Sequence, residues 1–456
     1  MTGRYKAYPK MASASEVIIE NHPEHWILTR VKFNSIVKAR VGWHGLKSDD
    51  FTEVGPYLVT GSDFKGKFIQ WEHCYHCDEE RYDQDENIQL KNGDLLLTKD
   101  GTIGKVALVS GLDGKATLNS GVFVVRPITD EYTTQFYYWL LLSRAFTDFV
   151  DYYKTGSTIA HLYQDTFVNF KFPLPPLVEQ QKIANFLDHE TAKIDTLINK
   201  QEELIKLLKE KRQAVISHAV TKGLNPDAPM KDSGVEWLGE VPEHWAIIPL
   251  KHLCRFSGGG TPTKDNLIYW TNGTIPWVSP KDMKSQRVTQ TTDYITEKAV
   301  VESSTNYVDS GALLMVVRSG ILQRTIPVAI NDVVVTLNQD MKALKFNQKM
   351  AVDFALHFIV GNEKALLLEW SKEGATVESI EHEYLANGLL PVPPMPEQLS
   401  IVQYLSTEME KFSQLETRAI LGIELLKERK TALISAAVTG KIDVRDWQES
   451  TYQESA

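Results

Sequence analysis

Three short stretches hold residue types that often do chemistry, and none has the spacing that the chemistry needs. The glycine-rich run at 258–264 (GGGTPTK) lacks the GK[ST] with which a P-loop holds phosphates and magnesium, so it predicts a loop rather than a nucleotide site. Cys74 and Cys77 form a CxxC with two histidines beside it, but the third cysteine, Cys254, lies far along the chain. A structural zinc site needs four ligands, so reduced thiols on a surface loop are the expectation, with adventitious metal binding as the alternative.

The third stretch is the motif PEHW, which occurs at 23–26 and again at 242–245. Its histidines lack the HExxH spacing of a zinc protease, so we expect Trp26 and Trp245 to anchor a turn beside each sheet. No G-x-S-x-G elbow is present, and neither Pro-Pro dipeptide follows the Asp or Asn with which an amino-methyltransferase holds its target amine. The sequence therefore predicts a chain with no catalytic residues and no metal of its own.

Basic residues gather in two segments at matching places. Residues 25–48 contain five Arg or Lys and no carboxylate, and residues 244–264 contain three and again no carboxylate. The net charge of −10 argues against a generally basic nucleic-acid coat protein, so DNA binding would have to lie in such local patches. Either segment alone could be an ordinary solvated face, but the recurrence favours two surfaces that face a polyanion.

The length and composition are those of a cytoplasmic protein with two or three domains. The chain has 456 residues, no apolar run approaches the 18 of a membrane span, and the first ten residues contain no apolar signal core. Three cysteines in a chain of this length argue for a reducing compartment. We expect a cytoplasmic location and no membrane partner.

The elements that must position these segments come in two copies. Residues 173–223 and 391–440 align without a gap, so that Glu179-Gln180 matches Glu397-Gln398 at an offset of 218, and the two PEHW motifs match at 219. Each copy begins with prolines and continues as a proline-free helix of about 40 residues, which would span roughly 60 Å. A repeat this long predicts a domain duplication, with a globular region of about 150 residues before each helix.

A 4,3 spacing of apolar residues predicts a coiled-coil seam along both helices, sustained for about five heptads. In the first helix the predicted seam is Ile183, Leu187, Ile194, Leu197, Leu204, Leu208 and Val215. In the second it is Ile401, Leu405, Phe412, Leu415, Ala419, Leu426, Leu433 and Ala436.

Each globular region mixes short β-rich runs with helical patterns. Runs such as 95–98 and 122–125 favour strands, whereas 136–153 and 352–370 favour helices with an apolar face. We predict α+β domains, each a strongly bent antiparallel sheet with one or two helices. The predicted order is an N-terminal extension (1–22), a first domain (23–172), a central helix (173–223), a linker (224–241), a second domain (242–390), a second helix (391–440) and a tail (441–456).

The repeated pattern resembles the DNA-specificity subunit of Type I restriction-modification enzymes. The resemblance covers nearly the whole chain and is carried by the PLPP-x-x-EQ-x-x-I-x-x-(F/Y)-L start of each helix and by its K-E-x-(R/K)-x-A-(V/L)-I-S-x-A-V-T end. Also similar are 231–245 (KDSGVEWLGEVPEHW), 259–262 with 275–277, and 40–46. One departure is 10–21, where KMASASEVIIEN stands in place of the KDSGVEWLGEV segment. It leaves open how the first unit closes against the C-terminal helix.

The resemblance implies two pseudo-repeated target-recognition domains, each reading one half of a split, asymmetric DNA site. The two helices would pack antiparallel, hold the domains apart and bind methyltransferase subunits. The implied partners are double-stranded DNA, two methyltransferase subunits and restriction/translocase subunits, and S-adenosylmethionine, ATP and magnesium would be bound by those subunits rather than by this non-catalytic chain. Two alternatives remain at this point: a coiled-coil protein-interaction scaffold with no DNA role, and an enzyme with an unrecognised active site.

Two units that read different half-sites cannot do so with identical residues. Positions shared by both copies should therefore serve the scaffold or a partner, and positions that differ should read DNA. Arg and Lys can bind guanine or phosphates, and Thr and His can share hydrogen bonds with base edges. For the two tryptophans below, core packing is the alternative. The predicted DNA-binding residues are Arg30, Lys32, Lys38, Arg40, Trp43, His44, Lys47, Lys65 and Lys67 in the first unit, and Lys251, Arg255, Thr261, Thr263, Lys264, Trp277, Lys281, Lys284 and Arg287 in the second.

Overall fold

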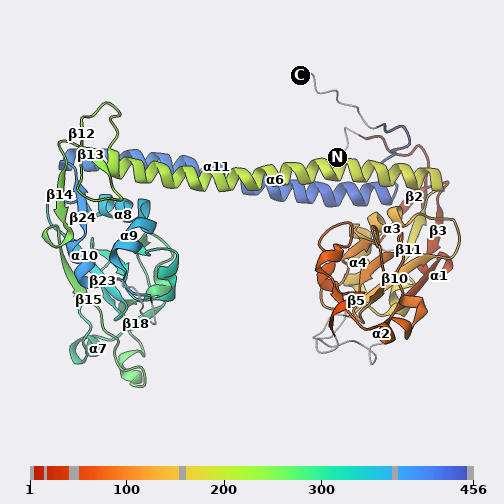
Figure 1. Ribbon diagram of the computed structural model, residues 1–456, viewed down its shortest axis with the longest axis horizontal. Coiled ribbons are helices and arrows are strands. Elements are labelled where there is room, and N and C mark those ends of the chain that lie inside the picture. Colours follow the sequence, from red (N-terminus) through yellow and green to blue (C-terminus); the bar gives the residue numbers. More distant parts are fainter. Residues whose placement is uncertain (1–4, 15–17, 41–50, 154–160, 372–377, 449–456) are drawn as a thin grey trace. The chain divides into compact units, whose positions relative to one another are not determined.

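The computed structural model describes residues 5–14, 18–40, 51–153, 161–371 and 378–448 (Figure 1). The chain divides into two compact units: unit 1 comprises residues 1–202 with 421–456, and unit 2 comprises residues 203–420. Two long helices, α6 (Leu177–Lys222) and α11 (Met395–Val438), each contribute residues to both units.

Unit 1 is built on two small sheets. The first has the antiparallel order β4 (Ser35–Ala39), β10 (Val122–Pro127), β7 (Leu95–Thr98) and β8 (Val106–Leu108). In the second, β5 (Thr52–Val59) pairs antiparallel with β6 (Tyr75–His76) and parallel with β9 (Ala116–Leu118). All four residues of β7 are buried, because both faces of the first sheet are covered. A hydrophobic cluster fills the space between the first and second sheets, and helix α3 (Thr134–Leu141) also packs on the first sheet. Short helices complete the unit: α1 (Val31–Asn34), α2 (Glu79–Asp83), α4 (Arg144–Tyr153) and α5 (Gln164–Phe167).

Unit 2 repeats this plan with additions. Its first sheet has five strands in the order β15 (Cys254–Gly258), β23 (Met341–Phe346), β20 (Leu313–Val316), β21 (Val328–Asn331) and β17 (Arg287–Val288). Its second sheet has four strands in the order β18 (Asp293–Ile295), β16 (Ile275–Val278), β22 (Val335–Leu337) and β19 (Tyr307–Val308). Its helices are α7 (Glu297–Glu302), α8 (Val352–Gly361), α9 (Glu363–Trp370) and α10 (His382–Asn387).

The predicted fold class is confirmed, with one correction to the sheets. Both units are α+β, and equivalent strands pair alike: Val59 opposes Leu118 in unit 1 as Val278 opposes Leu337 in unit 2. These two pairs are parallel and belong to a second sheet, whereas the sequence predicted one antiparallel sheet. Parallel pairing joins strands that are distant in sequence, so no local turn signal announces it.

The departure at residues 10–21 does not change the strand pairing shown by the described residues. Strands β1 (Met11–Ser13) and β2 (Asn21–Pro23) form a hairpin in which Met11 opposes Pro23. In unit 2, β12 (Met230–Asp232) and β13 (Glu240–Pro242) pair identically, with Met230 opposite Pro242. The hairpin depends on backbone hydrogen bonds, so different side chains can form it. Two further strand pairs close the units: β3 (Ile27–Arg30) with β11 (Lys171–Leu174), and β14 (Ala246–Pro249) with β24 (Leu389–Val392).

The segment after α11 closes unit 1. Gly440 follows the helix with φ +73°, and a Cβ atom there would lie 2.2 Å from Pro23 Cδ, so only glycine fits this approach. Beyond it, the backbone N–H of Asp443 donates to Lys6 O at 2.7 Å, and the guanidinium of Arg445 lies 5.0 Å from the ring centroid of Tyr8. At the matching place in unit 2, Gly223 follows α6 beside Trp245.

Within each unit, α6 and α11 run antiparallel. In unit 1 the Lys430 ammonium contacts both oxygens of Asp195 at 2.6 and 2.7 Å. In unit 2 Lys209 lies 3.3 Å from Glu416. The predicted antiparallel helix pairing is confirmed.

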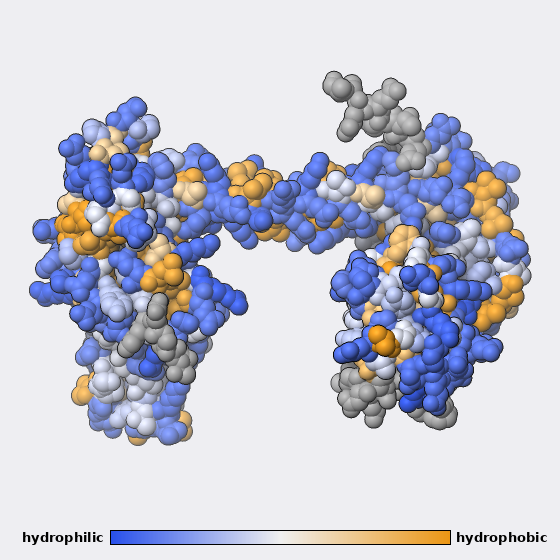
Figure 2. Space-filling view, viewed as in Figure 1, coloured by the Kyte–Doolittle hydropathy of each residue, from blue (hydrophilic) through white to orange (hydrophobic). Residues whose placement is uncertain are grey.

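The predicted seam fails at two equivalent leucines and at Leu204, whereas later members such as Ala419 and Leu433 are buried as predicted. Leu197 and Leu415, which are equivalent, are 46% and 47% exposed, whereas Ile198 is only 8% exposed. A strict 4,3 pattern has a period of 3.5 residues, and an α-helix has 3.6 per turn, so the step of four from Ile194 to Ile198 takes up the drift. Leu204 is also exposed. Figure 2 shows patches of hydrophobic surface along the long helices.

Candidate nucleic-acid interface

The PEHW motif meets the Glu-Gln pair at the start of the long helix in both units. In unit 1, Nε2 of His25 lies 2.8 Å from Glu179 Oε2, and the Trp26 indole donates to Glu179 Oε1 at 3.2 Å. In unit 2, Nε2 of His244 lies 2.7 Å from Glu397 Oε2. Both tryptophans are buried and donate a backbone hydrogen bond to the proline of their motif, so they anchor a turn.

The neighbouring glutamine ties the long helix to the globular domain. Gln180 is fully buried; its carboxamide donates to the carbonyls of Glu131 and Pro175, both at 2.8 Å, and accepts from the backbone N–H of Thr133 at 2.9 Å. Thr133 is the N-cap of α3. Gln398 makes the three equivalent bonds, with Lys349, Pro393 and Ala351. The shared Glu-Gln pair is therefore scaffold, as expected for positions common to both copies.

Two predicted DNA-binding residues, Lys32 and Lys251, are held alike. Each ammonium donates to an equivalent asparagine Oδ1, Asn169 at 2.9 Å and Asn387 at 2.7 Å. Arg30 shares Asn169 at 3.5 Å. These side chains remain exposed, but their identical bonding marks them as shared features rather than readers of different sequences.

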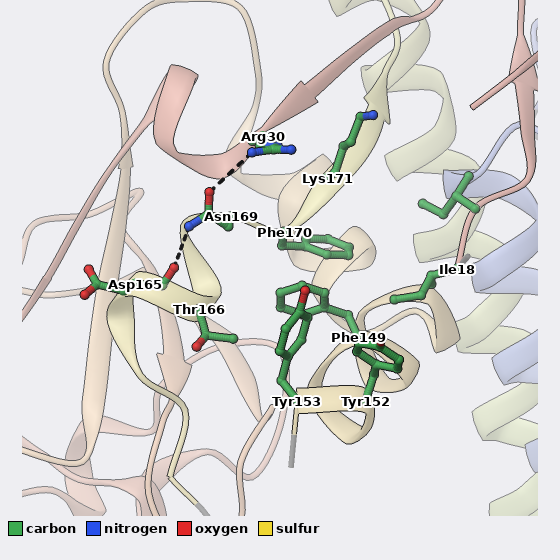
Figure 3. A pocket seen from close by; sticks show the side chains of 11 residues that line it. Ile18, Arg30, Phe149, Tyr152, Tyr153, Asp165, Thr166, Asn169, Phe170 and Lys171 are labelled. Carbon is green, nitrogen blue, oxygen red and sulfur yellow. Dashed lines mark hydrogen bonds between the residues drawn. The ribbon is translucent and has the colours of Figure 1, made fainter. Parts of the chain in front are cut away.

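In unit 1, Arg30 and Asn169 also line an open cavity of about 550 Å³ (Figure 3). Phe149, Tyr152 and Tyr153 form its aromatic side, and Arg30 and Lys171 come from the paired strands β3 and β11. Of the predicted DNA-binding residues that the structure describes, Arg30 alone lines this cavity.

Arg40 does not fit its predicted role. Its side chain is 3% exposed, with Nε donating to Leu118 O at 2.8 Å and Nη2 to Thr117 Oγ1 at 3.1 Å. Burial lowers the pKa of its guanidinium. Arg40 thus holds β9 inside unit 1 and presents no accessible face to DNA.

Trp277 is likewise a packing residue. It is 5% exposed, its indole donates to Gly260 O at 3.0 Å, and its ring meets Trp270 edge-on at 5.1 Å. Core packing, the alternative considered for this residue, is what the structure shows.

Three further predicted contacts are compensated by carboxylates. Lys67 lies 2.5 Å from Asp188 of α6, and Lys281 lies 2.6 Å from Asp293. Arg287 bridges two aspartates, Asp332 at 2.9 Å and Asp353 at 2.7 Å. Because neighbouring carboxylates neutralise the charge of these side chains, they are weaker candidates for phosphate contacts.

The other predicted residues fall into three groups. Thr261 donates its hydroxyl to Gln339 Oε1. Trp43, His44 and Lys47 lie outside the described residues. Five cations and a threonine are exposed and make no side-chain hydrogen bond or ion pair within the described residues, and they remain the freest candidates for DNA contacts: Lys38, Lys65, Arg255, Thr263, Lys264 and Lys284.

Cys74 and Cys77 are buried rather than on a surface loop, which corrects that expectation. Burial raises the pKa of Cys74 to about 12 and that of Cys77 to about 11, so both are protonated thiols near neutral pH. Among the described residues, no group of three or more His, Cys, Asp or Glu could hold a metal ion.

The sequence reasoning missed a row of polar side chains in unit 2. Beyond Thr261 and Gln339, the row continues through Asp340 to Arg318. Gln339, Asp340 and Arg318 lie outside the basic segments, whereas Thr261 lies within the second one. The internal alignment could have indicated Arg318, because it pairs this residue with Asp100, which has the opposite charge.

Two copies of one α+β domain, each with exposed basic residues and each joined to long antiparallel helices, define a duplicated recognition protein. A family model described as Type I restriction modification DNA specificity domain matches residues 39–207 and 242–425, one copy after the other. The chain belongs to this family. It is a specificity subunit of a type I restriction-modification enzyme, and the scaffold without a DNA role is not favoured.

Two relatives of similar sequence are also specificity subunits. The EcoR124I/EcoR124II specificity subunit of Escherichia coli is 38% identical over 195 residues, 42% of this chain and 44% of that protein. The MjaIX specificity subunit of Methanocaldococcus jannaschii is 25% identical over 450 residues, 92% of this chain and 98% of that protein.

Two solved structures share the fold. A chain from a study of complex assembly and conformational transition in the type I R-M system has a TM-score of 0.72 at 18% identity and covers 92% of this chain and 99% of its own. The HsdS subunit from Thermoanaerobacter tengcongensis has a TM-score of 0.57 at 18% identity, covering 92% and 98%. No helix among the described residues is long and apolar enough to cross a membrane.

Proposed function

We propose that this chain reads a split, asymmetric DNA site, one half with each unit, and has no catalytic role of its own. The duplication is the observation that carries this proposal. Glu179-Gln180 and Glu397-Gln398 make matching scaffold contacts, and each unit matches a DNA specificity domain. The side chains on the surfaces of the two units differ, so the two halves of the site differ in sequence.

The partners follow from the same proposal. Two methyltransferase subunits and restriction/translocase subunits assemble with the chain in the cytoplasm, where the host DNA lies. S-adenosylmethionine, ATP and magnesium are bound by those subunits. The names of the curated relatives, which are specificity subunits of type I restriction enzymes, support this assignment.

The test is to express the chain with its methyltransferase subunits in a host without other DNA methylation and to sequence the methylated genome. We expect methylation at one motif made of two specified halves separated by unspecified base pairs. The methyltransferase subunits without this chain should methylate nothing. A continuous motif, or no methylation from a complex that co-purifies intact, would overturn the proposal.

Direct DNA binding gives an independent measure. A complex that contacts Z phosphates should bind with a log K that falls by about 0.9Z for each tenfold rise in salt. Binding that is absent at low salt would contradict a DNA role.

A further inference from the structure

Strands β7 and β20 end at equivalent points that share one backbone arrangement. After β7, Lys99 N donates to Gly121 O at 2.9 Å, and Leu162 N donates to Lys99 O at 2.8 Å. The next residue, Asp100, forms an isolated antiparallel bridge with His161. Unit 1 thus places the side chain of Asp100 just after the end of the central strand β7 and that of His161 beside it.

Unit 2 repeats these backbone bonds atom for atom. Val317 N donates to Asp340 O and Ile380 N donates to Val317 O, both at 2.8 Å. The next residue, Arg318, forms the matching isolated bridge with Ser379. The backbone is therefore common to both units, and only the side chains differ.

The second residue after the strand has opposite charge in the two units: it is Asp100 in unit 1 and Arg318 in unit 2. In unit 1, the Asp100 carboxylate contacts His161 Nδ1 and lies 3.3 Å from the Lys99 ammonium, and Gly121 leaves the opposite position empty of a side chain. In unit 2, the strand-end residue is Arg318 and the opposite position carries Asp340. A shared backbone that carries different side chains is what two readers of different sequences require.

Arg318 is both exposed and held in place. Its Nε and Nη2 each lie 2.8 Å from Asp340 Oδ1, yet its side chain is 55% exposed. Asp340 is only 22% exposed, and its backbone N–H donates to Asn338 Oδ1 at 2.9 Å. A guanidinium carries five N–H donors, so three remain unused within the described residues and the fork is preorganised.

The surroundings suit a nucleic-acid groove. Gln339 joins Asp340 to Thr261, so that the row offers both donors and acceptors at the surface. The preceding residue, Asn338, lines an open depression of about 370 Å³ together with Lys264 and the Lys281–Asp293 ion pair, and Lys264 is the cation there that no carboxylate of the described residues compensates. Base edges need donors and acceptors, and the flanking phosphates need cations.

We propose that Arg318, positioned by Asp340, reads a guanine in the half-site of unit 2, and that Asp100 with His161 occupies the equivalent reading position of unit 1. This inference rests on the proposed function, because it assumes that each unit reads one half-site. Arginine can donate two hydrogen bonds to O6 and N7 of guanine in the major groove. The Asp100 carboxylate only accepts hydrogen bonds, so unit 1 selects a base that presents an amino group in the major groove, cytosine or adenine, and rejects guanine, which presents only acceptors there.

The test compares the wild-type complex with Arg318→Ala, both assembled with methyltransferase subunits. Once the methylated motif is known, binding is measured to duplexes in which each specified base pair of both half-sites is changed singly. Wild type should lose about 5- to 150-fold at one G·C pair, the range of one good bidentate base contact. The Arg318→Ala complex should bind the parent duplex weaker by a similar factor and show no further loss when that pair is changed.

Other outcomes decide against the proposal. Equal weakening on all duplexes, with a salt slope reduced by about one, would make Arg318 a phosphate contact. Unchanged binding would remove it from the interface. A wild-type complex with no split motif would instead overturn the proposed function, so the two failures are distinguishable.

Matched variants keep the result interpretable. Arg324→Ala removes another exposed arginine of unit 2 and should leave every base preference unchanged. Arg318→Lys keeps the charge but loses the planar fork, so it should lose discrimination at the same pair even if Arg318→Ala assembles poorly. Asp100→Asn should change a base preference in the other half-site only, and a change in the same half-site would contradict the equivalence.

Discussion

At the scale of single residues, the internal alignment separates scaffold from surface better than residue type does. Gln180 and Gln398 were identified only as shared positions, and the structure shows them making the same three backbone hydrogen bonds. Residue type alone misassigned Arg40, because a buried arginine that binds strand carbonyls and an exposed one look alike in sequence. It missed Arg318 because that residue lies outside the basic segments.

We predict that Gln180→Ala lowers the free energy of unfolding of unit 1 by about 2–4 kcal/mol. Three hydrogen bonds of a buried carboxamide are lost, and at least one backbone group is left unpaired at a cost of about 1–3 kcal/mol. Chemical denaturation of the full chain measures the effect. Gln181→Ala is the control, because Gln181 is exposed and, among the residues that the structure describes, its side chain bonds only Asn185; its effect should stay within about 0.5 kcal/mol. Equal effects of the two variants would show that the carboxamide does not hold the helix.

At the scale of elements, the sequence pattern predicted the long helices and the α+β domains, and the family resemblance implied the antiparallel pairing of the helices. It did not predict the second sheet of each unit, since the parallel pairs β5 with β9 and β16 with β22 depend on distant segments. The predicted seam failed at Leu197 for a different reason. Both Leu197 and Ile198 are apolar, so their order cannot show which one faces the partner helix.

The corrected seam makes a prediction about two neighbouring residues. Ile198→Ala should lower the free energy of unfolding by about 1.5–3 kcal/mol, because Ile198 is 8% exposed and its removal leaves a gap between the helices. Leu197→Ala should change it by less than about 0.5 kcal/mol, because that side chain is 46% exposed. Denaturation followed by helical circular dichroism compares them. A larger effect at Leu197 would restore the strict 4,3 seam.

At the scale of the whole molecule, each long helix supplies residues to both units, so helix length belongs to neither unit alone. The residues proposed to read DNA lie within the globular parts. Helix length and base choice should therefore vary independently.

We predict that inserting one heptad into each helix, after Glu202 in α6 and after Ile420 in α11, changes the number of unspecified base pairs in the methylated motif. A heptad keeps the seam on the same face, so the helices can still pair. Methylome sequencing should show both half-sites unchanged. Insertion into α6 alone is the control, because it puts the seam out of register and should lower the melting temperature. An altered half-site with an unaltered spacing would show that the helices act in base selection.

The closure of unit 1 by Gly440, Asp443 and Arg445 has a consequence for synthesis on the ribosome. Domains of a nascent chain usually fold in the order in which they emerge. Unit 2 is continuous in sequence, from 203 to 420, whereas unit 1 needs residues 421–448 to cover its PEHW turn and to pair with α6. The unit translated first is therefore completed last, and a chain that stops short of Gly440 carries a finished second reader beside an unfinished first one.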